Sequence, residues 1–505
     1  MIVLSASRWG KYYPSRSWTA AMDRPDPSSF VVSILRGVGV AAWTWVAFAA
    51  VSATILVRVD DEMQAALDGA VSSSFVESFL GVLTFDFGLS ILYQEPAIDI
   101  VSTALPTTLL LLGQVAVVAA VLGGALVALS RNGPGARRLV EVFGYLGAFP
   151  VPVVLFGCYA LGTSTGWAWL SPGAGGSLGN WLEATALALP IAAVTGRVVV
   201  REPRNRGWLI DAWLFGMWIL GTVVFVERAA EIPGLGYFYM DANRAFDVPL
   251  TFAIGAALVL LGLVGVVARE LAVSAGSSDR FGSADAGPGP AVPDGGTGVS
   301  DLDTVLRDDR RVQAGLAGFG VFLAIGVVGS VLLDPVPVGQ IPQSPIRATV
   351  EALGVVTFAA VGVATVASVL GVAFGLLSAR VRYGRAATAL TVGLAANVSF
   401  FVWMQFARAA IDLPLPDSVW LGVAVTPPVA LVARRKLAGR AGIPVAALWR
   451  PLGVAVTGAA VAALVVVQIQ LVGSASGHVL EPPTGVAVGL PVLSLFLLGE
   501  GLRRR

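Results

Sequence analysis

Histidine and cysteine, two side chains common in catalytic and metal sites, occur once each in this 505-residue chain. His478 is the only histidine and Cys158 the only cysteine, which excludes an intrachain disulfide, a cysteine-based metal site and most histidine-dependent catalysis. The only lysines are Lys11 and Lys436, and neither follows the glycine-rich loop that cradles ATP phosphates. We therefore expect no enzymatic activity, no cofactor and no metal ion in this chain.

One short segment matches a hydrolase pattern. Residues 175–179 read Gly-Gly-Ser-Leu-Gly and so fit GxSxG, which serves catalysis when a strand leads into the serine. No strand is predicted before Ser177, and the surrounding loop is rich in glycine. The chain has 59 glycines, so a chance match is the simpler explanation.

The overall composition indicates a membrane protein. Hydrophobic residues make up 56% of the chain and charged residues 13%, whereas a soluble domain needs about a quarter of its residues charged. The net charge of +1 gives no reason to expect a nucleic-acid partner. We expect the lipid bilayer to be part of the solvent and the chain to be a multi-pass protein of the cell membrane.

Apolar stretches near the length of about 20 residues that a bilayer requires recur along the chain. They predict an all-α protein of about twelve transmembrane helices. The stretches are 36–58, 104–130, 137–162, 182–200, 208–226, 248–271, 313–333, 350–378, 386–411, 417–433, 452–472 and 483–499.

Positive charge orients these helices. If residues 1–35 are a cytoplasmic segment and the helices alternate in direction, most of the 33 lysines and arginines fall on the cytoplasmic side, as the positive-inside rule requires. The exceptions are Arg58, Arg228, Arg244, Arg347 and Arg408. Both termini are therefore predicted to be cytoplasmic, and residues 59–103 and 227–247 to be external.

A linker divides the chain into two halves. Residues 273–312 are acidic and rich in glycine and proline, and such a segment cannot bury enough apolar surface to fold. Because both its ends are predicted to be cytoplasmic, residues 36–272 and 313–505 would be parallel six-helix repeats. A sequence match between the halves supports this repeat: residues 118–125 read VAAVLGGA and residues 366–373 read VASVLGVA. The alternative is a chance likeness, because helices rich in alanine and valine resemble one another.

Three motifs occur together in the first half. Residues 85–90 read FDFGLS, residues 104–110 read ALPTTLL, and residues 227–249 contain Glu227, then PGLG and FDVP. In this order the motifs resemble the permease subunits of dipeptide, oligopeptide and nickel-type ABC importers of prokaryotes, except that Phe85 stands where the family has glycine. The second half resembles the partner permease more loosely, through Asp334-Pro335 and the closing residues 498–503.

The resemblance implies two divergent permease subunits fused in one chain. Such a protein forms the path by which a peptide or similar small solute crosses the membrane. Its expected partners are separate ABC ATPase subunits, which hydrolyse ATP in the cytoplasm, and an extracytoplasmic solute-binding protein. The sequence does not identify the solute.

One cytoplasmic loop of the second half resembles the ATPase-docking loop of that family. Its candidate docking residues are Lys436, Ala438, Gly442, Leu448, Trp449 and Arg450. The alternative is an ordinary basic loop that Trp449 anchors at the membrane interface. The corresponding loop of the first half, residues 201–206, is too short for a docking helix, so ATPase coupling through one half, or through neither, remains open.

Polar side chains inside the predicted spans are candidates for lining the path: Gln114, Asn397, Gln405 and Gln468. Hydrogen bonding between helices is the alternative role for each of them. Two other functions stay open: a secondary transporter of two parallel repeats, and a non-transporting permease descendant that serves as a membrane scaffold. The scarcity of ionisable residues in the spans argues against ion coupling.

Overall fold

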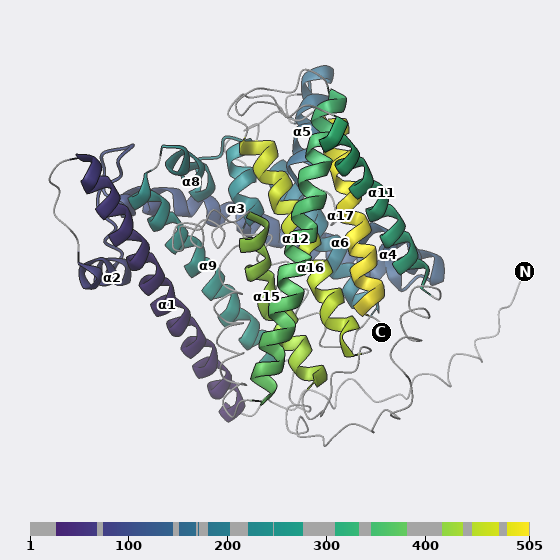
Figure 1. The fold of residues 1–505 in the computed structure, drawn as a ribbon, viewed down its shortest axis with the longest axis horizontal. Helices are drawn as coiled ribbons and strands as arrows, with labels where there is room; N and C mark the ends of the chain where they lie inside the picture. The colour runs from purple at the N-terminus through teal and green to yellow at the C-terminus, as the bar shows by residue number, and fades with distance from the viewer. Residues whose placement is uncertain are drawn as a thin grey trace, which may run out of the picture.

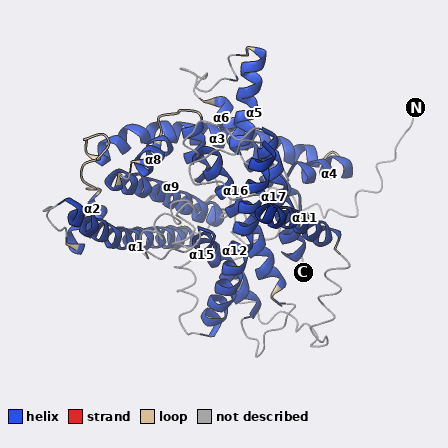
Figure 2. Cartoon of the chain, turned by 45° about the horizontal axis from the view of Figure 1, so that its top comes forward, coloured by secondary structure: helices blue, strands red, loops and turns tan. Residues whose placement is uncertain are grey.

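Every regular element that the computed structural model describes is an α-helix (Figure 2). The first half contains α1 (Pro27–Leu67), α2 (Phe75–Thr84), α3 (Ala97–Ser130), α4 (Pro134–Phe143), α5 (Val151–Thr165), α6 (Trp181–Arg201), α8 (Leu235–Arg244) and α9 (Val248–Ala275). The second half contains α11 (Arg310–Leu332), α12 (Pro345–Arg380), α15 (Asp417–Leu437), α16 (Trp449–Gly473) and α17 (Pro482–Arg503). The structure describes residues 27–67, 74–144, 151–167, 170, 180–201, 221–245, 247–275, 309–332, 345–380, 417–437, 447–473 and 482–503.

Most of the predicted apolar stretches coincide with helices. The helices α6, α9, α11, α12, α15, α16 and α17 match their stretches to within a few residues. The helix α3 begins earlier than predicted, directly after Pro96, with Asp99 in its first turn, where a negative charge complements the helix dipole. The stretch predicted at 137–162 corresponds to two elements, α4 and α5. The stretch at 386–411 and nearly all of the linker lie outside the described residues.

Within the part of the chain that the structure describes, three helices are long and apolar enough to cross a membrane: α3, residues Arg310–Gly329 of α11, and residues Ala352–Arg380 of α12. Large apolar side chains on these helices face outward, among them Val121 on α3 and Val369 on α12, which are 66% and 63% exposed. Exposed apolar surface of this kind is typical of contact with lipid. The helices therefore indicate a membrane protein.

The helices of the second half pack around α12, which contacts α11, α15, α16 and α17 (Figure 1). Glycines allow the closest of these contacts. A Cβ atom placed on Gly371 would lie 2.5 Å from the Val429 side chain of α15, and one on Gly422 would lie 2.6 Å from Val366 of α12. The backbones of α12 and α15 therefore approach each other in a way that larger residues would prevent.

In the first half, α3 contacts α6 and α9, and α1 contacts α9. The second half contains contacts between α12 and α15, between α12 and α17, and between α11 and α17. Gly123 lies against Ala192 of α6, while Gly371 lies against Val429 of α15. The described contacts between the halves include those of α5 with α16 and α17.

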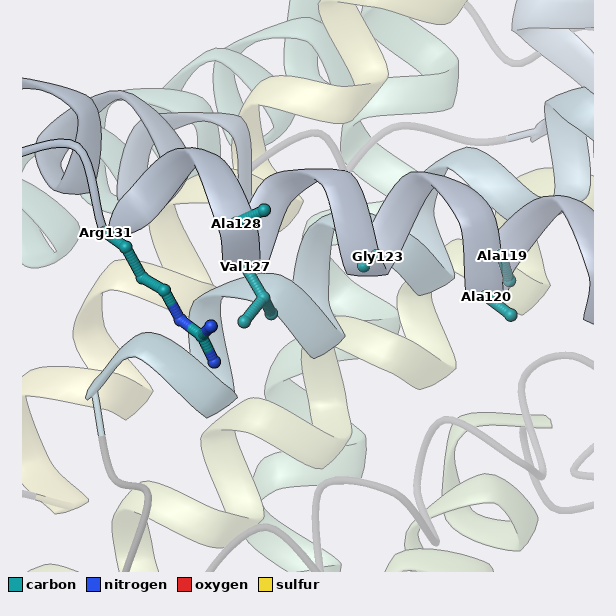
Figure 3. Close-up of a pocket in the computed structure, with 7 residues that line it drawn as sticks. Ala119, Ala120, Gly123, Val127, Ala128 and Arg131 are labelled. Atoms are coloured by element: carbon teal, nitrogen blue, oxygen red, sulfur yellow. The ribbon is translucent and has the colours of Figure 1, made fainter.

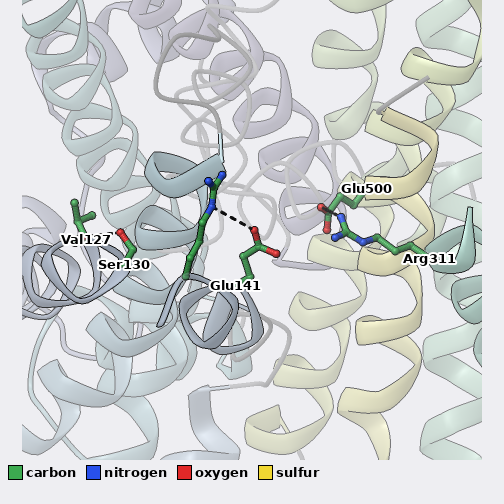
Figure 4. Close-up of polar contacts among 6 residues, drawn as sticks. Val127, Ser130, Glu141, Arg311 and Glu500 are labelled. Atoms are coloured by element: carbon green, nitrogen blue, oxygen red, sulfur yellow. Dashed lines mark hydrogen bonds and ion pairs between the residues drawn. The ribbon is translucent and has the colours of Figure 1, made fainter. Parts of the chain in front are cut away.

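Polar contacts occur at the predicted cytoplasmic ends of the helices (Figure 4). Arg311 at the start of α11 forms an ion pair of 2.7 Å with Glu500 near the end of α17. On α3, the Ser130 hydroxyl donates to the carbonyl oxygen of Val127 at 2.6 Å, and on α12 Ser378 donates to the carbonyl of Gly375 at 3.0 Å. The ion pair joins the first and last helices of the second half, whereas the two serine bonds lie within single helices.

Candidate functional site

The FDFGLS motif forms a compact loop that follows α2. Phe85 ends this helix with a φ of 64°, a left-handed conformation that glycine adopts most easily. Its ring stacks on Trp45 of α1 with centroids 5.0 Å apart, which fixes the residue in place. Gly88 also has a positive φ, 82°, and the Ser90 N–H then donates to the carbonyl oxygen of Glu95 at 2.8 Å. The loop thereby turns the Ser90 side chain toward the protein interior.

Ser90 contacts Asp247, which lies 157 residues further along the chain. The Ser90 hydroxyl donates to Asp247 Oδ2, the same oxygen accepts from the Leu92 N–H at 3.0 Å, and Oδ1 accepts from the Leu250 N–H at 3.2 Å. Both side chains are fully buried. The carboxylate of Asp247 therefore caps the start of α9 and holds the FDFGLS loop against it.

A second set of contacts joins α3 to the start of α8. The Leu235 N–H donates to the Thr108 hydroxyl at 2.8 Å, and the Gly236 N–H donates to Glu227 Oε2 at 2.6 Å. Thr108 and Glu227 are both fully buried. The first backbone N–H groups of α8, which have no partner within the helix, are satisfied by these two side chains.

The two glycines of PGLG permit this close packing. A Cβ atom on Gly234 would overlap the Glu227 carboxyl group, and one on Gly236 would lie 2.7 Å from the Val224 carbonyl oxygen and still closer to Val224 Cα. We call Ser90, Thr108, Glu227, Gly234, Gly236 and Asp247 the motif cluster. The three sequence motifs thus meet in two sets of contacts, and residues 227–249 take part in both.

The surface next to the motif cluster carries one charged pair. Arg228 and Asp241 form an ion pair of 3.1 Å, and the Arg228 guanidinium lies 4.7 Å from the centre of the Tyr237 ring. Phe238 packs edge to face against Tyr93 with centroids 5.6 Å apart. These contacts further join residues 227–247 to the segment before α3.

Glu227 gives the motif cluster a dependence on pH. Burial raises the pKa of its carboxyl to about 7, although hydrogen bonds from Thr108 and from the backbone of Gly236 and Tyr237 act in the opposite direction. The folded chain thus holds this proton more tightly than the unfolded chain, whose pKa is 4.5. The stabilisation is therefore full below a pH of about 4.5 and is lost as the pH rises through about 7, a change of about 3 kcal/mol.

We expect Glu227→Gln to flatten this dependence. Glutamine keeps an oxygen that can accept from Gly236 but has no charge to bury, so the unfolding temperature of the variant in detergent should fall less than that of the wild type between about pH 5 and about pH 8. Glu231→Gln, at an exposed position of the same segment, is the matched control and should follow the wild type. Parallel curves for wild type and Glu227→Gln would contradict the assignment.

The candidate path residues are only partly visible. Gln114 lies on α3 and is 7% exposed, and its Oε1 atom has no hydrogen-bond partner. Gln468 lies on α16, but its side chain is outside the described residues, as are Asn397 and Gln405 altogether. The path-lining role of all four stays a prediction.

The candidate docking loop is also seen in part. Lys436 lies in the last turn of α15, whereas Ala438 and Gly442 lie outside the described residues. Leu448 packs against a small apolar cluster of Ala433, Leu437 and Ala447.

Trp449 packs against the main core, and its Nε1 atom, like Nε of Arg450, is buried without a hydrogen-bond partner. Both Leu448 and Trp449 therefore contribute to packing within the chain. Their role in docking a partner stays a prediction.

Sequence reasoning overlooked one buried acid. Glu183, in the first turn of α6, is 2% exposed and accepts a 2.9 Å hydrogen bond from the Tyr159 hydroxyl of α5. A single carboxyl within an apolar stretch was the available signal, since an acid buried at membrane depth is costly unless it has a role.

A groove runs along α3, lined by Ala119, Ala120, Gly123, Gly124, Val127, Ala128 and Arg131 (Figure 3). Apart from Arg131 at its end, these residues are small or apolar and come from one helix. The groove therefore offers shape but almost no polar recognition. Among the described residues, no group of three or more His, Cys, Asp or Glu side chains could hold a metal ion.

No family model, no curated protein and no solved structure matches the chain.

Proposed function

We propose that this chain is the membrane-spanning permease component of an ABC-type importer, with both permease subunits fused in one polypeptide. It provides the path for a peptide or similar small solute. Separate ATPase subunits supply the energy on the cytoplasmic side, and an external binding protein delivers the solute.

The motif cluster is the observation that carries this proposal. Residues of the three motifs come from distant parts of the sequence and meet in pairs: Ser90 bonds to Asp247, and Thr108 accepts from the start of α8, next to the bond between Gly236 and Glu227. A chance likeness between short motifs gives no reason for their residues to meet. The contacts give the three motifs one physical role, which is to hold the FDFGLS loop and α3 against residues 227–249. This shared role favours a genuine relation to the permease family.

The helix contacts of the two halves add support. The first and last helices of each half contact each other, as α1 does with α9 and α11 with α17. The helices that carry the matching stretches, α3 and α12, each pack on the next long helix of their half, α6 and α15, at a corresponding glycine. Two parallel repeats are the arrangement that a pair of fused permease subunits requires.

Purification of the full chain from its own membranes tests the proposal. We expect an ABC ATPase to copurify, and reconstituted vesicles to take up solute only with ATP. Deletion of residues 434–450 should remove the ATPase, because this segment holds the candidate docking loop. Deleting the same number of residues from the linker at 276–300 is the control and should leave the ATPase bound.

The same vesicles separate the alternative functions. Uptake driven by an ion gradient without ATP would favour a secondary transporter. Normal insertion with no solute flux under either driving force would favour a membrane scaffold. Either result would overturn the importer proposal.

A further inference from the structure

The Glu183 carboxyl is buried where α5 meets α6. It is 2% exposed and Tyr159 is 7% exposed, and the Tyr159 hydroxyl donates to Glu183 Oε1 at 2.9 Å. Among the described residues, no other hydrogen bond and no ion pair involves this carboxyl. One oxygen is thus held by a phenol, and the second is available to another partner.

No described positive charge lies near Glu183. Along α6 the next basic residue is Arg197, 14 positions on, and at 1.5 Å per residue this is about 21 Å away. On the packed helices α3 and α4, the basic residues Arg131, Arg137 and Arg138 lie at the opposite, cytoplasmic end. The other titratable groups toward this end of α3 and α5 are Cys158 and Asp99, neither of which is a cation.

A buried carboxylate without a cation is costly at membrane depth, and such groups usually pair with a charged partner. Tyr159 is a hydrogen-bond donor and supplies no charge. No cation in the described part of the chain supplies such a partner to Glu183.

The position of the pair suits a transported partner. The helix α5 contacts α6 of its own half and α16 and α17 of the other, so the pair lies on the helices through which the halves meet (Figure 1). The first turn of α6 is at its predicted external end.

The longer of the two external segments of the first half is acidic, whereas the segment at 227–247 carries Arg228 and Arg244. The predicted external segment 59–103 contains no lysine or arginine. It contains the acids Asp60, Asp61, Glu62, Asp68, Glu77, Asp86, Glu95 and Asp99. Such a surface raises the local concentration of positively charged solutes and disfavours anionic ones.

We propose that Glu183 binds the ammonium group of a cationic solute on its way through the membrane, with Tyr159 as a positioning residue that orients the carboxylate. This inference rests on the proposed transport function and adds to it a substrate class, solutes that carry a protonated amine. The buried carboxylate supplies the charge, and the phenol fixes the direction of its free oxygen.

Two probes that differ by one charge test the proposal. Alanyl-alanine amide carries a single ammonium group, and its N-acetyl form carries none. Binding of each to the full chain in detergent is measured by equilibrium dialysis. We expect the charged probe to bind the wild type, the acetylated probe not to bind, and Glu183→Gln to weaken binding by about tenfold or more, because a charged contact is lost.

Further variants separate charge from shape. Glu183→Asp keeps the charge and should retain more affinity than Glu183→Gln, and Tyr159→Phe should weaken binding less than Glu183→Gln. Glu231→Gln, at an exposed acid of the external segment 227–247, is the control and should bind like the wild type. Size-exclusion chromatography confirms that each variant is folded.

The proposal would be overturned if the two probes bound equally well, if neither probe bound, or if the charged probe bound Glu183→Gln as tightly as the wild type. Failure of the importer proposal would look different. ATP-dependent uptake would then be absent, while the binding difference between the two probes persisted.

Discussion

Asp247→Ala is expected to destabilise the first half by about 3–5 kcal/mol. The Asp247 carboxylate is fully buried and accepts hydrogen bonds from the Ser90 hydroxyl and from the N–H groups of Leu92 and Leu250. Alanine would leave two buried donors, the Ser90 hydroxyl and the Leu250 N–H, without this partner, each at a cost of about 1–3 kcal/mol, and it would also remove the acceptor of the part-buried Leu92 N–H. The unfolding temperature of the purified chain in detergent measures the loss.

Two further variants identify the cause. Asp247→Asn keeps the shape and one acceptor oxygen, so it should cost clearly less than alanine. Ser90→Ala should cost about 1 kcal/mol alone and little in the Asp247→Ala background, because the two residues share one interaction. Additive effects of the two alanine variants would show that Ser90 and Asp247 act independently, contrary to the structure.

Gly236→Ala is expected to have the second large effect, about 3 kcal/mol. Its new methyl group would lie 2.7 Å from the Val224 carbonyl oxygen, which belongs to backbone and cannot rotate away. Relief of this overlap would move the start of α8 and break the bond from the Gly236 N–H to Glu227. A lower unfolding temperature and a smaller monodisperse fraction on size-exclusion chromatography are the expected results.

Gly124→Ala is the matched control for this variant. A Cβ atom at Gly124 on α3 would meet nothing within 4 Å, so the substitution should be neutral or stabilise the helix by up to about 1 kcal/mol. A similar loss of stability in both variants would mean that glycine flexibility, rather than the contact with Val224, explains the effect.

The lengths of the apolar stretches predicted which segments form helices better than they predicted where those helices begin and end. The stretch at 248–271 became α9, Val248–Ala275, because an apolar run of that length has few alternatives to a helix. The stretch at 36–58 lies within the longer α1, Pro27–Leu67, which continues through Asp60, Asp61 and Glu62. A search for apolar stretches stops at the first charged residues, but the helix itself continues through them.

The motif residues could be recognised from the sequence, but their partners could not. Nothing in the spacing of Ser90 and Asp247 predicts their contact, because it depends on how α3 and α9 pack. Glu183 was missed for a related reason. In the sequence, a single acid at the edge of an apolar stretch looks like the polar end of a transmembrane helix. Only the structure shows that Tyr159 lies beside Glu183 and donates to it.

Phe85 illustrates how a departure from a motif is tolerated. Glycine adopts the left-handed φ of 64° without cost, whereas phenylalanine incurs a steric penalty of about 1 kcal/mol. Stacking on Trp45 offsets that penalty, which is why an aromatic residue can occupy this position. The sequence showed that phenylalanine replaces glycine at position 85, but only the structure shows the stacking on Trp45 that makes the replacement tolerable.

The separation of 157 residues between Ser90 and Asp247 has a consequence for biogenesis. During synthesis the FDFGLS loop is made long before its partner is translated, and until α9 begins the Ser90 hydroxyl and the Leu92 N–H lack the carboxylate that accepts from them. The contact that closes this end of the first half can therefore form only after the start of its last helix has been synthesised. A chain that stops before Asp247 would lack this closure, however many of its earlier helices had formed.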